Sequence, residues 1–516
     1  RRTDLEQILG KALKKTAAER YATASDLLAD LRAASSGQGA VVETEKAIGV
    51  PPFVFLTAVE DKESLSLGFA DALITTLGRV EGLRVPPTAA IVRYAGENDP
   101  QRISRELGVR YVLQGSIQRL GDQWRVSIQV LDAQARKTVF SEKYDFKLSH
   151  VFEVQDEIAR QVAEALLQRF QVGNLKSRQR YSSDSRAYGA YLHGLDASYS
   201  EAPENVDLAI RCFTEAIERD PHFALAHAML AHASSSRYFG YEPRYKWLQL
   251  AEKHCARALQ LDSQLPEAIM ARAYLLWTPQ KNFPHFEAIR ELRKAIAMQP
   301  NLDHAYNRLG TILAHIGQLR ASQEAFMTAR RINPQNFGNT NLIQCYVWGG
   351  QYARAAQELE TCRRLRPTNK YYLWFRPQPA LLLGELENAA KWVGEAVEAY
   401  PDEPMMVSLQ GLVQARLGRK DLARLAAERA CASPHSFGHT HHAHYQIACI
   451  YAVLGETQLA MHWLERAVAG GFPCWPFFLR DPNLEELRGL PDFQELVAGL
   501  RSEFPSSAGP EAQGAA

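Results

Sequence analysis

Small and apolar residues recur at helical spacing between residues 187 and 470, and the pattern itself repeats about every 34 residues. Five glycines mark its phase, with separations of 33, 34, 34 and 37 residues: Gly317, Gly350, Gly384, Gly418 and Gly455. Small residues follow five or twelve positions after these glycines, including Ser322, Ala329, Ala355, Ala389, Ala396, Ala423, Ala430, Ala460 and Ala467. A repeat of this period predicts a solenoid of stacked helix pairs.

The residue types at these positions suit the turns and contacts of an αα-hairpin. Glycine adopts the left-handed conformation that ends the first helix of a pair. Alanine on the second helix lets the partner helix approach closely, and Pro334 ends that helix. Three looser copies upstream, around Ala209, Ala251 and Ala288, bring the predicted total to eight helical pairs.

One copy is similar to the tetratricopeptide repeat through seven residues: Tyr306, Leu309, Gly310, Gly317, Phe326, Ala329 and Pro334. The resemblance implies a right-handed superhelix whose first helices line a concave groove. Projecting these helices gives eight candidate groove residues: Asn307, Arg308, Thr311, Asn341, Gln344, Tyr371, Trp374 and Phe375. Asparagine suits a peptide backbone, arginine a carboxylate and the aromatic rings an apolar side chain. The alternative is that Trp374 or Phe375 packs between neighbouring repeats.

The pattern changes upstream, where residues 47–171 predict a compact α/β domain. Period-two alternation predicts an antiparallel three-stranded meander, closed by an amphipathic helix. Strands are expected over 48–56, 83–85, 109–120, 123–132 and 137–145, and helices over 65–80, 102–107 and 154–166. The expected fold class is therefore a small α/β domain followed by an all-α repeat superhelix.

Three runs in this domain resemble the TolB-like amino-terminal domain: 68–73, 105–116 and 155–159. That domain accompanies repeat arrays in bacterial adenylate cyclases, transcriptional regulators and kinases. The resemblance implies a signalling accessory, and small-molecule sensing by this domain stays open. Gly115 is expected to mark a close approach within the sheet.

Residues 1–32 predict two short amphipathic helices that look like the last two helices of a bacterial serine/threonine kinase catalytic domain. In that family the arginine corresponding to Arg20 pairs with a glutamate of the activation segment. Residues 33–46 are small and polar and predict a flexible linker. No glycine-rich phosphate loop, His-Arg-Asp or Asp-Phe-Gly occurs, so the chain as given lacks the groups that position ATP and magnesium. The first residue, Arg1, suggests a fragment, and a parent that is an active kinase is the alternative.

The charge balance excludes some partners. Lys and Arg number 59 against 58 Asp and Glu, so a polyanionic partner such as nucleic acid is not expected. No run of 18 apolar residues occurs, which predicts a cytoplasmic chain without a membrane span. Seven cysteines without paired spacing predict reduced, mostly buried thiols.

Five histidines form the densest titratable group: His435, His439, His441, His442 and His444. Alternating histidines bind zinc or nickel in some proteins. No cysteine or carboxylate lies among them, and they fall in an expected loop between two repeats. We therefore predict no metal or other cofactor and keep the group as a weak candidate.

The carboxy-terminal part is expected to close the array. Residues 471–503 are rich in aromatic residues and predict a segment that caps the last repeat, whereas 504–516 predict a disordered tail. Taken together, the sequence predicts a non-catalytic scaffold that recruits a protein or peptide through the groove of a signalling protein. It leaves the oligomeric state open.

Overall fold

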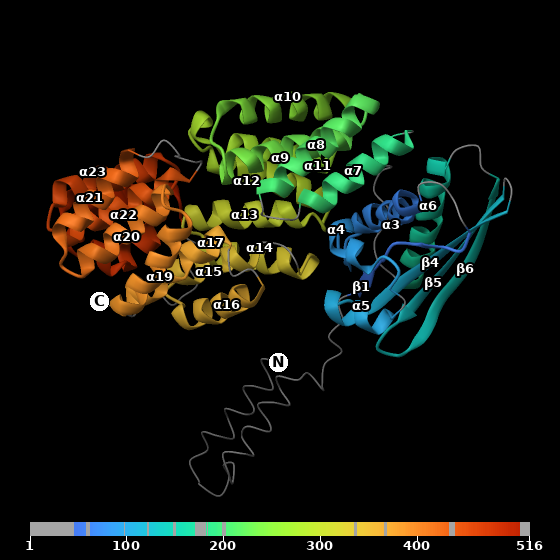
Figure 1. Cartoon of the computed structure of the whole chain (residues 1–516), viewed down its shortest axis with the longest axis horizontal. Helices are drawn as coiled ribbons and strands as arrows, with labels where there is room; N and C mark the ends of the chain where they lie inside the picture. The colour runs from blue at the N-terminus through green and yellow to red at the C-terminus, as the bar shows by residue number, and fades with distance from the viewer. Residues whose placement is uncertain are drawn as a thin grey trace, which may run out of the picture.

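The computed structural model describes residues 46–57, 62–97, 99–120, 123–147, 151–170, 182, 184–198, 203–334, 338–365, 369–432 and 439–505. An α/β domain is followed by a long array of helices that carries the rest of the described chain (Figure 1). The kinase-like segment 1–32 and nearly all of the linker lie outside the described residues. Among the residues described, no helix is long and apolar enough to cross a membrane.

The α/β domain is built on one mixed sheet with the strand order β3-β1-β4-β5-β6, in which β2 also pairs with β4. Its strands are β1 (Lys46–Gly49), β2 (Val54–Phe55), β3 (Leu83–Arg84), β4 (Tyr111–Leu120), β5 (Gln123–Asp132) and β6 (Lys137–Lys147). The predicted meander is confirmed, because β4, β5 and β6 pair antiparallel. The single strand expected over 48–56 is wrong. Pro51 and Pro52 lack the N–H groups that continue a ladder, and the run divides into β1 and β2, which pair parallel with β4.

Helices cover the sheet and complete the core of this domain. They are α3 (Lys62–Gly78), α4 (Thr88–Ile91), the 3-10 helix η2 (Val92–Tyr94), α5 (Pro100–Leu107) and α6 (Val151–Phe170). Alternate residues of β5 are buried, among them Val126, Ile128 and Val130, and they share one core with Val162 of α6. A Cβ added to Gly115 would lie 2.1 Å from the Phe53 ring, so this glycine permits a close approach within the domain.

The array contains eight consecutive helix pairs in the described residues. They are α7 (Ser185–Ser198) with α8 (Pro203–Arg219), α9 (Ala224–Gly240) with α10 (Tyr245–Leu261), α11 (Pro266–Leu276) with α12 (His285–Met298), α13 (Asp303–His315) with α14 (Leu319–Ile332), α15 (Gly338–Trp348) with α16 (Tyr352–Leu365), α17 (Lys370–Phe375) and α18 (Pro377–Leu383) with α19 (Leu386–Ala399), α20 (Pro404–Arg416) with α21 (Lys420–Ala432), and α22 (Thr440–Val453) with α23 (Thr457–Ala469). A short 3-10 helix, η3 (Pro279–Lys281), precedes α12. The first helix of the sixth pair is divided at Pro377, which cannot donate the helical hydrogen bond.

The repeat positions lie where the hairpin geometry requires small residues. The five phase glycines all have φ between 71° and 80°, the left-handed region. Many alanines of the second helices have no exposed surface, among them Ala329, Ala355, Ala389, Ala396, Ala423 and Ala460. All seven cysteines are free thiols.

The carboxy-terminal segment does more than cap the last repeat. It contains α24 (Trp475–Arg480), the 3-10 helix η4 (Pro482–Leu487) and α25 (Pro491–Glu503). As expected for a cap, η4 packs on α22 of the last pair. In addition, Pro476 lies against Gly317, and Arg480 Nη1 donates to the Trp348 carbonyl at 2.8 Å. The segment thus joins the eighth repeat to the fourth and fifth, a closure that the sequence did not predict.

The expected start of the tail at residue 504 is wrong. Phe504 is buried and its carbonyl accepts a hydrogen bond from Trp475 Nε1 at 2.9 Å, so it belongs to the packed segment. Residues 506–516 lie outside the described part of the chain.

The α/β domain docks on the array through buried polar contacts. Asn301, between α12 and α13, donates from Nδ2 to the carbonyls of Gly78 (2.9 Å) and Leu83 (2.8 Å) and accepts from the Val85 N–H at 3.1 Å. The hydroxyl of Tyr188 on α7 donates to Asp71 on α3 at 2.8 Å. These bonds fix the two parts relative to each other.

Candidate functional site

A cavity of about 180 Å³ lies on the inner side of the array, where first helices of successive repeats meet. All eight residues that the sequence singled out for a groove line it: Asn307, Arg308, Thr311, Asn341, Gln344, Tyr371, Trp374 and Phe375. The structure adds residues from earlier and later first helices, among them His232, Phe239, Tyr274, His304, His315, His439 and His442. The cavity therefore draws on repeats that lie far apart in the sequence.

Amide side chains from two neighbouring repeats form one polar wall of the cavity. Asn341 Nδ2 on α15 donates to Asn307 Oδ1 on α13 at 3.1 Å. Gln344 lies one turn after Asn341 on the same face, since residues three apart are neighbours on a helix. The Thr311 hydroxyl donates within its own helix to the Asn307 carbonyl at 3.1 Å. This wall offers both donors and acceptors of the kind that pair with a peptide backbone.

Arg308 projects into a group of aromatic rings. Its guanidinium carbon lies 3.8 Å from the ring centre of Tyr274, 5.0 Å from that of Phe239 and 5.6 Å from that of Trp277. Ring faces attract a cation electrostatically, which holds the side chain in place at only 9% exposure. No carboxylate of the described residues forms an ion pair with Arg308, whose charge lies against the ring faces.

The aromatic wall is largely buried. Trp374 is 3% and Phe375 1% exposed, and their rings pack against each other at 4.6 Å between centres. Trp374 also packs against His442 at 4.9 Å. The structure therefore places the Trp374 ring in the packing between repeats, as the alternative interpretation expected, with Phe375 buried beside it, and both residues still line the cavity.

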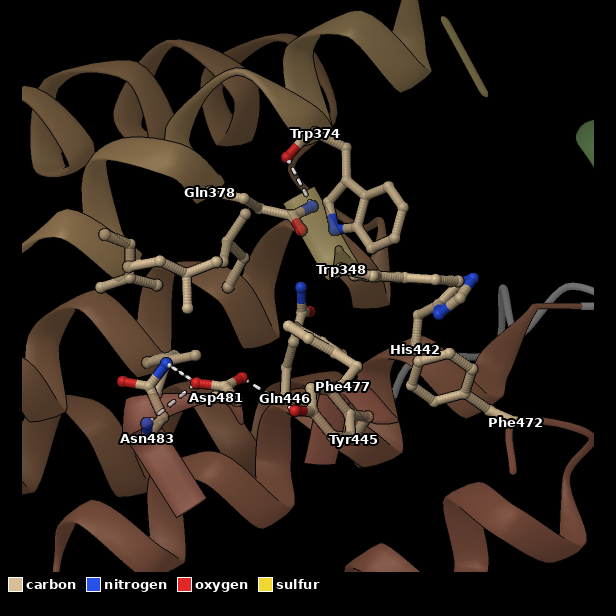
Figure 2. A pocket seen from close by; sticks show the side chains of 14 residues that line it. Trp348, Trp374, Gln378, His442, Tyr445, Gln446, Phe472, Phe477, Asp481 and Asn483 are labelled. Atoms are coloured by element: carbon tan, nitrogen blue, oxygen red, sulfur yellow. Dashed lines mark hydrogen bonds between the residues drawn. The ribbon is translucent and has the colours of Figure 1, made fainter. Parts of the chain in front are cut away.

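A second, smaller cavity shares Trp374 and His442 with the first (Figure 2). The carboxy-terminal segment supplies part of its wall through Phe472, Phe477 and Asp481. Asp481 accepts from the Tyr445 hydroxyl at 2.8 Å and from Asn483 Nδ2 at 2.7 Å. Burial raises the pKa of Asp481 above its ordinary value despite these bonds. Because Asp481, Tyr445 and Asn483 are paired with one another, they indicate a structural role for the second cavity.

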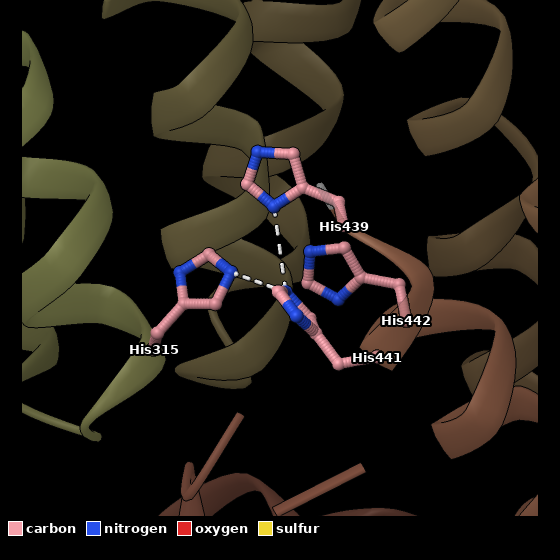
Figure 3. A group of neighbouring side chains, drawn as sticks. All are labelled: His315, His439, His441 and His442. Atoms are coloured by element: carbon pink, nitrogen blue, oxygen red, sulfur yellow. Dashed lines mark hydrogen bonds between the residues drawn. The ribbon is translucent and has the colours of Figure 1, made fainter. Parts of the chain in front are cut away.

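Four imidazoles converge beside the main cavity: His315 of α13 with His439, His441 and His442 (Figure 3). One ring nitrogen from each lies within 4.8 Å of those from the other three. The distance from His315 Nε2 to His441 Nε2 is 3.1 Å, and that from His439 Nδ1 to His441 Nε2 is 3.4 Å. Burial lowers the pKa of all four imidazoles well below 6.5, which favours their neutral form.

The structure corrects the sequence interpretation of this histidine group. The expected loop is wrong for His441 and His442, which lie in the first turn of α22 and are buried. His444 lies on the same helix but packs on Trp463 instead, at 5.3 Å between ring centres. His435 lies outside the described residues. His315 was missed because it is 126 residues from His441, and only its place one turn after Thr311 on the groove-lining helix pointed to it.

Two family profiles match parts of the chain. Residues 45–161 match the family described as the second domain of HilA/YgeH-like transcriptional regulators, and residues 303–336 match the tetratricopeptide repeat. The first description differs from the TolB-like resemblance. A curated relative, putative adenylate cyclase 3 of Rhizobium meliloti strain 1021, is 32% identical over 187 residues, 36% of this chain and 32% of the relative. The chain thus spans about a third of the length of that relative.

Three similar solved structures cover different shares of the chain. The PilF structure of Pseudomonas aeruginosa aligns with 44% of this chain and 97% of its own (21% identity, TM-score 0.32). The Cut9–Hcn1 structure aligns with 67% of this chain and 59% of its own (15% identity, TM-score 0.41). Yeast Tom70 aligns with 68% of this chain and 78% of its own (13% identity, TM-score 0.34). The profile match at residues 303–336, within the eight helix pairs, shows that the chain contains tetratricopeptide repeats behind a small α/β domain.

Proposed function

We propose that the array is a protein-interaction scaffold that binds an extended peptide segment with an acidic side chain in the main cavity. The observation that carries this proposal is the convergence of eight independently selected residues, from three successive repeats, on one cavity. The cavity is concave, mixes apolar and polar walls, and contains one cation without a carboxylate partner among the described residues. These are the features of a peptide site that needs both shape and charge.

Each wall has a separate part in this proposal. The amides of Asn307 and Asn341 pair with backbone groups of the peptide, which gives affinity independent of its sequence. The Arg308 guanidinium donates hydrogen bonds to a peptide carboxylate, because its fork of N–H donors matches the two carboxylate oxygens. The ring edges of the aromatic wall then contact an apolar side chain next to that carboxylate. Since the whole chain is almost neutral, recognition depends on this local charge.

The test is binding of fluorescent peptides from a position-scanned library, measured by anisotropy. Asp or Glu at one position should favour binding, and Arg308→Gln should weaken that peptide about tenfold or more, since bonds to charged groups contribute about 1.5–3 kcal/mol. Asn341→Ala should weaken acidic and neutral peptides alike. Two exposed substitutions outside the cavity, Arg293→Gln and Asn388→Ala, serve as matched controls. Equal affinity in the Arg308 variant and its control would contradict the site.

The place of this scaffold in signalling is a broader proposal. The match to a putative adenylate cyclase and to a regulator domain supports a role beside an effector domain of a bacterial signalling protein. The kinase-like segment 1–32 suggests a specific alternative: this chain is the carboxy-terminal part of a serine/threonine kinase. The coding sequence upstream of Arg1 tests it: an in-frame glycine-rich loop and His-Arg-Asp favour the kinase, and a different catalytic domain contradicts it.

Ligand sensing by the α/β domain is the second candidate function. A cavity of about 310 Å³ lies at the sheet, lined by the polar Gln114, Ser116, Ser127 and Gln129 and by the apolar Pro51, Pro52 and Val54. Amides and hydroxyls of this kind suit a small neutral metabolite. A thermal-shift screen with nucleotides and metabolites tests it, and a ligand whose effect is lost in Gln129→Leu would support it.

A further inference from the structure

The imidazole of His315 on α13 meets those of His439, just before α22, and of His441 and His442 in its first turn, although more than a hundred residues separate the two segments (Figure 3). We propose that they bind one divalent late transition-metal ion, with Zn²⁺ as the best fit. This metal site goes beyond the peptide-binding function, because it needs neither Arg308 nor the amide wall.

Backbone hydrogen bonds determine the tautomers of two rings. His315 Nδ1 lies 2.7 Å from the Thr311 carbonyl, and His441 Nδ1 lies 2.6 Å from the Gly470 carbonyl. A carbonyl oxygen only accepts, so each Nδ1 carries the hydrogen, and each Nε2 of a neutral ring is left with a lone pair. These two lone pairs meet at 3.1 Å. Such a contact is repulsive unless a cation lies between the nitrogens.

The nitrogen spacing fits a tetrahedral ion. Zn–N bonds of about 2.0–2.1 Å place neighbouring ligand nitrogens about 3.3 Å apart. The two closest contacts, 3.1 and 3.4 Å, bracket this value. All four nitrogens lie within 4.8 Å of one another, so binding would need the farthest pair to move closer by about 1.5 Å or less. Four ligand nitrogens, from α13 and from the start of α22, thus lie close enough to share one ion.

The surroundings have the features of a metal site. Histidine ligands usually donate their second ring N–H to a carbonyl or carboxylate, and the Thr311 and Gly470 carbonyls supply this for two of the four. An all-imidazole set suits Zn²⁺, Cu²⁺ or Ni²⁺ and not Mg²⁺ or Ca²⁺. A proton shared between the rings would also relieve the repulsion. However, a shared proton joins only two of the four nitrogens, whereas one metal ion can contact all four.

The ion would link the fourth repeat to the eighth. His315 ends the first helix of the fourth pair, and His441 begins that of the eighth. The metal would therefore reinforce the same closure that the carboxy-terminal segment makes through Pro476 and Arg480. It would lie beside the peptide cavity, which His315, His439 and His442 also line.

The test uses the untagged full chain, stripped of metal by a chelator and titrated with Co²⁺ alone. We expect one equivalent to bind and to give the intense visible bands of four-coordinate cobalt, which Zn²⁺ then displaces. His315→Gln and His441→Gln should each weaken binding by about a hundredfold or more, given that even supporting groups of metal ligands contribute tenfold to a hundredfold. His444→Gln, on the same helix but packed on Trp463, should bind like the unaltered chain.

Circular dichroism shows whether each variant folds. If the ligand variants do not fold, X-ray absorption of the unaltered zinc form decides: a shell of about four nitrogens with imidazole scattering supports the site. Absence of stoichiometric binding by the unaltered chain overturns the proposal. Undiminished binding by both folded ligand variants overturns it too, because another group of the chain would then hold the ion. Peptide binding in the presence of chelator is measured separately, so failure of one proposal does not decide the other.

Discussion

Single glycines in the array serve two different purposes. The five phase glycines have positive φ and end first helices, whereas Gly310 lies within α13 and allows the Phe326 ring to approach. A Cβ at Gly310 would lie 2.7 Å from that ring, which has no exposed surface. In contrast, Gly394 in α19 has nothing within 4 Å of its added Cβ. Identical substitutions at the two helical glycines should therefore have opposite effects.

We predict that Gly310→Ala destabilises the array and Gly394→Ala does not. The first forces Phe326 to shift in a packed core, at a cost of about 1–3 kcal/mol. The second gains about 0.5–1 kcal/mol, because alanine loses less backbone entropy on folding. Urea unfolding followed by circular dichroism measures both free energies. A stabilised Gly310→Ala would show that the ring moves without cost.

Histidine pairs outside the metal site also give the protein a pH dependence. His227 Nδ1 and His254 Nδ1 lie 2.8 Å apart between α9 and α10. Burial, together with the nearby His227 and Lys253, lowers the pKa of His254 from 6.5 to about 4. The unfolded chain takes up this proton at about pH 6.5, but the folded chain does not until about pH 4.

The free energy of unfolding should therefore fall as the pH drops from about 6.5 towards 4. The loss from His254 is about 1–3 kcal/mol, at about 1.4 kcal/mol for each unit of pKa difference. In His254→Gln, the free energy of unfolding should differ less between pH 7 and pH 5 than in the unaltered chain, because the contribution of His254 is missing. His193→Gln, at an exposed position of α7, should keep the full difference. Urea titrations at the two pH values decide between these outcomes.

At the scale of elements, the carboxy-terminal segment determines how the array ends. Solenoid repeats normally contact only their neighbours, and their stability is a sum of local terms. Here Phe472 and Phe478 pack on Tyr445 of α22, at 5.3 and 5.4 Å between ring centres, while Arg480 reaches the fifth repeat. This segment should make distant repeats unfold together.

Phe478→Ala should lower the free energy of unfolding by about 3–5 kcal/mol, because the ring has no exposed surface. Its neighbour Leu479 is 36% exposed, and Leu479→Ala should cost less than about 1 kcal/mol. Hydrogen exchange should also become faster in α13 and α15 of the Phe478 variant. Faster exchange confined to α22 and α23 would mean that the segment is only a local cap.

At the scale of the whole molecule, the α/β domain and the array are joined by Asn301. Its side chain satisfies one N–H and two carbonyls of the α/β domain, and it is itself 9% exposed. A buried polar group without a partner costs about 1–3 kcal/mol. This side chain, together with the Tyr188–Asp71 hydrogen bond, should therefore couple the unfolding of the two parts.

Asn301→Ala should weaken this coupling by about 2–4 kcal/mol, from the three lost bonds and the unpaired Val85 N–H. Hydrogen exchange should become faster in α3 and β3 and stay unchanged in α20 and α21. Asn388→Ala, an exposed substitution on α19, should leave both regions unchanged. A uniform change along the chain would show that Asn301 stabilises the array and not the interface.

The sequence by itself determined the repeating part of this protein. Glycine at the turns, alanine at the closest contacts and period-two alternation in the meander act over short distances, so their positions predicted the helix pairs and three strands. The eight cavity residues followed from the same local rule, because a helix fixes which positions share a face. Pro51 and Pro52 also act locally, and they predict the break in the strand expected over 48–56.

The tertiary structure decided which distant segments meet. The pairing of His315 with His441, the contact of Pro476 with Gly317 and the position of Asn301 under the α/β domain all join residues more than a hundred positions apart. Such contacts depend on the small rotation from each repeat to the next, summed over the array, and no local pattern encodes that sum. Local sequence patterns therefore determined the helices. The closure of the array and the grouping of the histidines depend on how the helices pack together.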